Sequence, residues 1–199
     1  MNIVIGAIIG YLLGSISFGI IVTKIVKGID IRDYGSGNAG MTNVMRTIGK
    51  GPAALVMLGD TLKGYLAVLI GLYLGGEIAG VIAGVAALLG HGFPLFFGFK
   101  GGKGVATGLG IMLVLVPDCS IIALIIFAVV VLISRYVSLG SMIATSSVPI
   151  SMIIFNKSLP LIILGILGAI LVVYFHRSNI KKIRNGTENR IGKPEGKRG

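Results

Sequence analysis

The chain has 199 residues, of which 54% are hydrophobic and only 13% are charged, and its mean hydropathy is +0.96. Soluble domains carry about a quarter of their residues as charged side chains, so this composition excludes an ordinary water-soluble protein. The net charge of +11 fits the basic cytoplasmic loops of membrane proteins and anionic ligands, and we do not expect nucleic acid as a partner.

Apolar runs follow one another along the whole chain, and a membrane-spanning helix needs about 20 such residues. The sequence predicts seven spanning helices, at about residues 3–23, 53–74, 78–97, 105–116, 120–133, 139–155 and 159–175. The first run lacks a basic n-region and a cleavage site, so we expect a retained helix rather than a signal peptide. The expected fold is an all-α integral membrane bundle forming one domain, 1–199, with a partly flexible cytoplasmic tail at about 180–199.

The connections between these runs alternate between long basic segments and very short turns. Segments 24–50, 98–104, 134–138 and 176–199 hold 16 of the 18 Lys and Arg residues. Lys63 lies inside the second predicted helix, and only Lys157 falls in a short turn. Because cytoplasmic loops collect Lys and Arg, the pattern predicts an outside amino terminus and a cytoplasmic carboxyl terminus in a multi-pass protein of the cytoplasmic (inner) membrane.

The densest polar stretch, residues 31–46, follows the first helix. Glycines at 35, 37 and 40 allow sharp turns and close approach of the backbone to a ligand. Arg46 offers a planar guanidinium that can bind phosphate through two hydrogen bonds. Hydroxyl and amide groups come from Ser36, Asn38, Thr42 and Asn43. The stretch therefore indicates a ligand-binding loop, the alternative being an ordinary solvated loop.

A second polar stretch, residues 90–107, contains Gly101, Gly102, Lys103 and Gly104 directly before an apolar run. Backbone N–H groups of such a loop and of a helix N-terminus can form an anion site, to which Lys103 adds a charge. The glycine spacing is not that of a Walker A loop, which argues against nucleotide hydrolysis. The alternative for Lys103 is that it only contributes to the positive charge common in cytoplasmic loops. His91 is expected to be structural.

The last predicted helix ends in a third polar stretch with His176 and Asn179, which are three residues apart and share a face if the helix continues. Glu188 follows as one acid among many bases and is interpreted as a structural tie. In the sixth helix, Ser138, Ser141 and Thr145 share one face, and two interpretations remain open: hydrogen bonds between helices, or a reach of Ser141 into the site.

Asp60 and Lys63 lie in the second predicted helix at a spacing that lets them pair, and we interpret them as structural. The chain has no cluster of Cys, His or acidic residues of the kind that binds a metal ion, so neither a metal nor a cofactor is expected. No His is followed five residues later by Asp, because position 96 is Phe and position 181 is Lys. The His–Asp pairing of soluble-type acyltransferases is therefore missing.

Together, Gly35–Asn43 with Arg46, Gly90–Pro94 with Gly101–Thr107, and His176–Asn179 resemble the bacterial acyl-phosphate-dependent glycerol-3-phosphate acyltransferase family. The resemblance runs nearly end to end, and Met41 is a small departure where Ala is usual. It implies a seven-helix enzyme that makes lysophosphatidic acid in the first acylation step of bacterial phospholipid synthesis. It also implies an acyl-phosphate donor made by a separate synthase, with which this chain could make functional contact.

The resemblance further implies that the middle glycine-rich loop is a phosphate loop and that Glu188 is structural. The residues that it implies for contact with the phosphate and glycerol groups are Ser36, Arg46, Lys103, Ser141, His176 and Asn179. Of these we expect Ser36, Arg46, His176 and Asn179 to be catalytic.

The chemistry of a mixed anhydride suggests a substrate-assisted mechanism. An acyl-phosphate is already activated, and its phosphate, with a second pKa near 6, can take the proton of the attacking hydroxyl. The protein then needs no catalytic dyad and works by positioning and charge stabilisation. The alternative function is a membrane transporter of an anionic phosphorylated metabolite.

Overall fold

The computed structural model describes residues 1–191, and within that range every regular element is a helix. The α-helices are α1 (Asn2–Gly14), α2 (Phe18–Lys27), α3 (Met41–Thr47), α4 (Lys50–Gly92), α5 (Val105–Leu115), α6 (Pro117–Ser134), α7 (Val137–Ile154), α8 (Leu159–Phe175) and α9 (Arg177–Arg184). Two short 3-10 helices, η1 (Ile31–Asp33) and η2 (Leu95–Phe97), lie in the loops.

The first apolar run is broken, whereas the sequence predicted one helix over 3–23. Ser17 has an extended backbone between α1 and α2, and the Ser15 hydroxyl donates to the Tyr11 carbonyl at 2.8 Å. Serine hydroxyls compete in this way with the backbone bonds of a helix. The Lys63 ammonium donates to the Ile16 carbonyl at 2.7 Å, so a carbonyl freed by the break has a partner from another helix.

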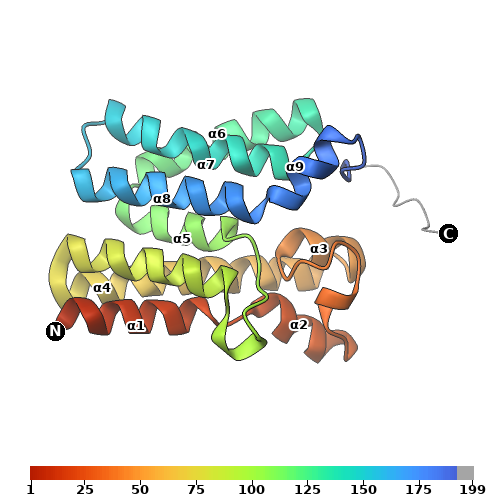
Figure 1. Cartoon of the computed structure of the whole chain (residues 1–199), viewed down its shortest axis with the longest axis horizontal. Coiled ribbons are helices and arrows are strands. Elements are labelled where there is room, and N and C mark those ends of the chain that lie inside the picture. The colour runs from red at the N-terminus through yellow and green to blue at the C-terminus, as the bar shows by residue number, and fades with distance from the viewer. Residues whose placement is uncertain (192–199) are drawn as a thin grey trace.

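Helix α4 joins the second and third predicted helices into one element of 43 residues. A straight helix of that length would measure about 65 Å, twice the apolar thickness of a bilayer. Gly75 and Gly76 leave the helical conformation, with φ values of −163° and +67°, and the chain turns back there (Figure 1). A Cβ atom at Gly71 would meet Ala79 and Gly80, so the two arms of α4 pack closely against each other.

The bundle has two halves with α5 between them (Figure 1). Helices α1, α2 and α4 form one half, and α6, α7 and α8 form the other. Helix α1 packs on α4 through buried glycines at 6, 10 and 14, and a Cβ at Gly10 would overlap the Ala83 carbonyl oxygen. Small residues allow this close approach of backbones, as in membrane helix pairs generally.

By length and composition, four stretches of helix within the described residues could each cross a membrane: 2–27, 50–97, 117–134 and 137–154. The pair α8 and α9, bent by 57°, would make a fifth, and α5 is apolar but shorter. The stretch 50–97 contains both arms of α4. The count of seven crossings and the orientation of the termini stay predictions.

The carboxyl-terminal segment folds back on the bundle after α9. Arg190 donates to the Tyr136 hydroxyl at 2.9 Å, and the Ile191 N–H donates to the Arg135 carbonyl at 2.9 Å. The predicted flexible tail thus includes a described part, through residue 191, that contacts the start of α7. The rest of that tail, residues 192–199, lies outside the described residues.

Candidate active site

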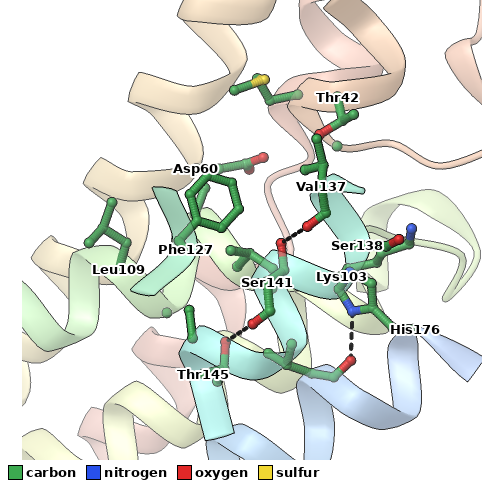
Figure 2. Close-up of a pocket in the computed structure, with 18 of the residues that line it drawn as sticks. Thr42, Asp60, Lys103, Leu109, Phe127, Val137, Ser138, Ser141, Thr145 and His176 are labelled. Atoms are coloured by element: carbon green, nitrogen blue, oxygen red, sulfur yellow. Dashed lines mark hydrogen bonds between the residues drawn. The ribbon is translucent and has the colours of Figure 1, made fainter. Parts of the chain in front are cut away.

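A cavity of about 270 Å³ lies between the two halves of the bundle. One end is polar and is lined by side chains from all three polar stretches of the sequence, among them Ser36, Arg46, Lys103, His176 and Asn179. The other end is lined by apolar residues of α5, α6, α7 and α8, such as Leu109, Phe127, Val148 and Leu164. In Figure 2, Lys103, Ser138 and His176 lie together, with Leu109 and Phe127 on the other side. The cavity can therefore hold a molecule with a polar head and an apolar tail.

The loop between α2 and α3 is organised by the buried side chain of Asn43. Its Oδ1 accepts from the Ser36 N–H at 2.9 Å, and its Nδ2 donates to the carbonyls of Tyr34 and Asn38, both at 3.0 Å, and of Ile31 at 3.3 Å. Asn43 lines the cavity, but these bonds use its amide to shape the loop. Asn38 and Thr42 also line the cavity, and the Asn38 side chain accepts from the Gly40 N–H at 3.0 Å.

A chain of hydrogen bonds joins the second and third polar stretches at the polar end. Lys103 Nζ donates to Asn179 Oδ1 at 2.6 Å, and Asn179 Nδ2 donates to Glu188 Oε1 at 2.7 Å. The same carboxylate oxygen accepts from the Ser138 hydroxyl at 2.7 Å. Glu188 thus ties α7 to the segment after α8, which fits the structural tie inferred from the sequence.

His176 is buried at the junction of α8 and α9, with 3% of its surface exposed. Its Nδ1 lies 2.8 Å from the Val172 carbonyl oxygen. Because a carbonyl can only accept, Nδ1 carries the proton and Nε2 is the nitrogen left for the cavity. Among the described residues no carboxylate lies within ion-pairing distance of His176, so it has no dyad partner there.

Three cations gather at the polar end of the cavity: Arg46, Lys103 and Lys182. Burial is the main cause that lowers the pKa of Lys103 to about 8, the positive charges of Lys182 and Arg46 add to the effect, and Glu188 opposes it. Arg46 Nη2 also lies 3.5 Å from the Asn189 carbonyl oxygen. Cations brought together without enough acid to balance them attract an anion, and the arginine fork can bind a phosphate through two hydrogen bonds.

The glycine-rich loop is placed differently from the other predicted site residues. Gly104 lines the cavity, but Gly101 and Gly102 do not. The Gly101 N–H donates to the Gly92 carbonyl at 3.2 Å, and the Gly102 N–H donates to the His91 carbonyl at 3.1 Å. These two N–H groups are used within the fold, so contact between them and a phosphate stays a prediction.

On α7, Ser141 lines the cavity, and its hydroxyl donates to the Val137 carbonyl of the same helix at 2.9 Å. Thr145, which also lines the cavity, donates in turn to the Ser141 carbonyl at 2.7 Å. Figure 2 shows both hydroxyls bonded along their own helix. The sequence left two interpretations open for Ser138, Ser141 and Thr145. The described hydroxyl bonds of these three residues do not join two helices, since Ser138 bonds to Glu188 in the segment after α9.

Two features of the cavity were missed from the sequence. Lys182 was read only as loop charge, although it stands three residues after Asn179, the spacing that already linked Asn179 to His176. The apolar end carries no signal in the sequence, because its residues are ordinary bundle residues. Within residues 1–191 no group of three or more His, Cys, Asp or Glu side chains could hold a metal ion.

Comparisons with known proteins agree over nearly the whole chain. The family model described as glycerol-3-phosphate acyltransferase matches residues 4–186. The glycerol-3-phosphate acyltransferase of Carboxydothermus hydrogenoformans is 44% identical over 96% of this chain and 97% of its own. That of Syntrophomonas wolfei is 49% identical over 91% of this chain and 93% of its own.

Solved structures match as well. The crystal structure of PlsY, an integral membrane glycerol 3-phosphate acyltransferase in its glycerol 3-phosphate form, superposes with a TM-score of 0.92 and 39% identity. The lysophosphatidic acid form of PlsY gives a TM-score of 0.90 at the same identity. Each match covers 96% of both chains.

Proposed function

This chain belongs to the glycerol-3-phosphate acyltransferase family, and from that premise we propose that its acyl donor is a fatty acyl-phosphate. The chain is an acyltransferase and an integral membrane protein, as its relatives are. In the proposed reaction, an acyl group passes from the acyl-phosphate to glycerol-3-phosphate, and lysophosphatidic acid and inorganic phosphate are the products. Family membership favours this enzyme over the alternative of an anion transporter.

The observation that carries the proposal is the cavity with a cationic end and an apolar end. Glycerol-3-phosphate and an acyl-phosphate together bring roughly −3 to −4 of charge to one site at neutral pH. Arg46, Lys103 and Lys182 supply the opposing charge. The acids among the described lining residues are Glu188 and Asp60, and Asp60 is paired with Lys63. The fatty chain of the donor fits the apolar end, which leaves its phosphate among the cations beside the acceptor.

We further propose that the substrates provide the base. The terminal hydroxyl oxygen of glycerol-3-phosphate attacks the acyl carbon, the bond from that carbon to the phosphate oxygen breaks, and the proton passes to the departing phosphate. His176, through Nε2, and Asn179 orient the acceptor, while Ser36, Arg46 and Lys103 hold the phosphate groups. This assignment is supported by the absence of a carboxylate beside His176 among residues 1–191, which leaves that imidazole without the partner of a dyad.

The test is an assay of the purified protein with glycerol-3-phosphate and one of three donors: acyl-phosphate, acyl-coenzyme A or an acyl carrier protein. Acyl-phosphate is expected to support turnover, and the two thioesters are not. Equal turnover with a thioester would overturn the donor assignment. If His176→Gln removed all turnover while binding of both substrates stayed unchanged, the substrate-assisted mechanism would be wrong.

We also propose that seven segments cross the cytoplasmic membrane and that the polar end of the cavity opens to the cytoplasm. The basic loops support this topology, since the three polar stretches meet at one end of the bundle. A cytoplasmic opening would let a separate acyl-phosphate synthase deliver the donor by contact with this enzyme. Labelling of single cysteines at positions 36 and 103, in a Cys119→Ser background, should place both on the cytoplasmic side. Labelling from opposite sides would overturn the topology.

A further inference from the structure

A charged pair is buried in the first arm of α4, and its two residues lie about one helical turn apart. Asp60 and Lys63 are 2% and 3% exposed, and Lys63 Nζ lies 2.8 Å from Asp60 Oδ1. Lys63 also donates to the Ile16 carbonyl at the break between α1 and α2. Burying two charges is costly unless both are well paired. The bond to the Ile16 carbonyl gives the buried lysine a second partner. Asp60, which lines the cavity, also has a second polar neighbour.

That neighbour is His91, at the end of the second arm of α4. His91 is 6% exposed, and its Nδ1 lies 3.5 Å from Asp60 Oδ1. At this distance the contact is not a regular hydrogen bond, but the negative charge of the carboxylate attracts this edge of the ring and orients it. Asp60 Oδ1 has the Lys63 ammonium at 2.8 Å, whereas among the described residues the buried Nδ1 of His91 has no regular hydrogen-bond partner. A buried ring nitrogen without a hydrogen bond calls for an explanation beyond stability.

The opposite edge of the His91 ring supports the glycine-rich loop. A Cβ atom at Gly102 would overlap His91 Nε2, so the ring lies directly against the loop backbone. The His91 carbonyl also accepts the Gly102 N–H at 3.1 Å. Gly102 does not have a positive φ, so its backbone conformation does not require glycine. Glycine is required there because the His91 ring leaves no room for a Cβ atom. One residue thus holds Gly102 with both its side chain and its main chain.

An Asp–His pair at a cavity has the composition of a catalytic dyad, but here Nε2, the nitrogen that would act as base, is covered by Gly102. We propose instead that Asp60 and His91 are positioning residues, which hold Gly102, and through it the adjacent Lys103, in the conformation that binds the phosphate group of the acceptor. Asp60 orients the ring, and the ring supports the loop. In the loop conformation held in this way, Lys103 Nζ donates to Asn179 Oδ1 at 2.6 Å. The inference rests on the proposed phosphate-binding role of Lys103.

The first test is the kinetics of His91→Ala and Asp60→Asn. The KM for glycerol-3-phosphate is expected to rise about tenfold in each, with kcat at saturating acceptor changing much less, because a misplaced loop weakens ground-state and transition-state binding alike. Asp60→Asn should also be measured with Lys63→Met, so that no unpaired charge remains buried. Thermal stabilisation by glycerol-3-phosphate alone, without donor, should weaken in parallel.

A double variant tests whether His91 acts through Gly102. Gly102→Ala alone should raise KM, because the added methyl group displaces either the loop or the ring. In the double variant His91→Ala/Gly102→Ala the methyl group has room, so KM should lie well below the product of the two single effects. Strictly multiplicative effects would show that the ring does not support Gly102, and the proposal would be wrong.

Ser151→Ala is the matched control. Ser151 is buried on α7, donates to the Val148 carbonyl at 2.8 Å and does not line the cavity, so it should change neither KM nor kcat. Lys103→Ala separates this inference from the proposed function. If Lys103→Ala leaves KM unchanged, the phosphate site itself is misassigned. If Lys103→Ala raises KM and His91→Ala and Asp60→Asn do not, only the positioning proposal fails.

Discussion

At the scale of single residues, Lys103 connects most of the candidate site. Its ammonium is held by Asn179, which is held in turn by Glu188, so the lysine is fixed before any substrate arrives. Such pre-organisation avoids the entropy cost of ordering a long side chain when the substrate binds. The sequence predicted Lys103 and Asn179 as site residues from separate stretches. Their contact depends on how the loop before α5 meets helix α9, which residue types alone do not reveal.

Loss of Arg46 should weaken substrate capture. A hydrogen bond to a charged group is worth about 2 kcal/mol, so Arg46→Ala should lower kcat/KM for glycerol-3-phosphate about thirtyfold. Arg184→Ala, at an exposed position of α9 outside the cavity, removes the same charge and serves as the control. Near-normal kinetics in a folded Arg46→Ala protein would contradict the role of Arg46 as a phosphate ligand.

The lowered pKa of Lys103 predicts a pH limit. Lys103 is charged below its pKa of about 8 and loses its proton, and with it the attraction for phosphate, as the pH rises through that value. We therefore expect kcat/KM for glycerol-3-phosphate to fall above about pH 8. In Lys103→Arg the fall should be absent to about pH 10, because arginine stays charged. A profile that is identical in the two enzymes would exclude Lys103 as its cause.

At the scale of elements, the polar loops were easier to predict than the helices that carry them. The runs at 53–74 and 78–97 appear in the structure as two arms of α4, since Gly75 and Gly76 supply the turn, but the second arm ends at Gly92 and not at 97. The break between α1 and α2 could not be predicted, because the Ile16 carbonyl depends on Lys63 from another helix. Sequence periodicity reports local preference, whereas this break is stabilised by a tertiary contact.

The contact between α1 and α4 makes a prediction for the glycines of α1. A Cβ at Gly10 would overlap the Ala83 carbonyl oxygen, whereas a Cβ at Gly51 would meet no atom within 4 Å. Gly10→Ala should therefore destabilise the protein by about 1–3 kcal/mol through overpacking, and Gly51→Ala should not. Melting temperatures in detergent provide the comparison. Equal melting temperatures for the two variants would mean that α1 and α4 can move apart to fit the methyl group without loss of stability.

At the scale of the whole molecule, the two halves of the bundle meet around α5 (Figure 1), and residues of both halves line the cavity. The sequence predicted that three polar stretches would gather on one side, and the structure brings them to one end of one cavity. It could not predict the apolar end, because α5, α6, α7 and α8 are apolar on most faces and only packing selects the residues that line the cavity. A membrane location fits the proposed reaction, since the proposed acyl-phosphate donor is lipid-soluble and the acceptor is water-soluble.

The most direct test of the account is the stoichiometry of the reaction catalysed by purified protein from acyl-phosphate and glycerol-3-phosphate. The account predicts that one inorganic phosphate is released for each lysophosphatidic acid formed, and that omission of glycerol-3-phosphate stops both. Phosphate release that continues without the acceptor, or lysophosphatidic acid formed without phosphate release, would contradict the claim that the cavity brings the two phosphorylated substrates together for direct transfer.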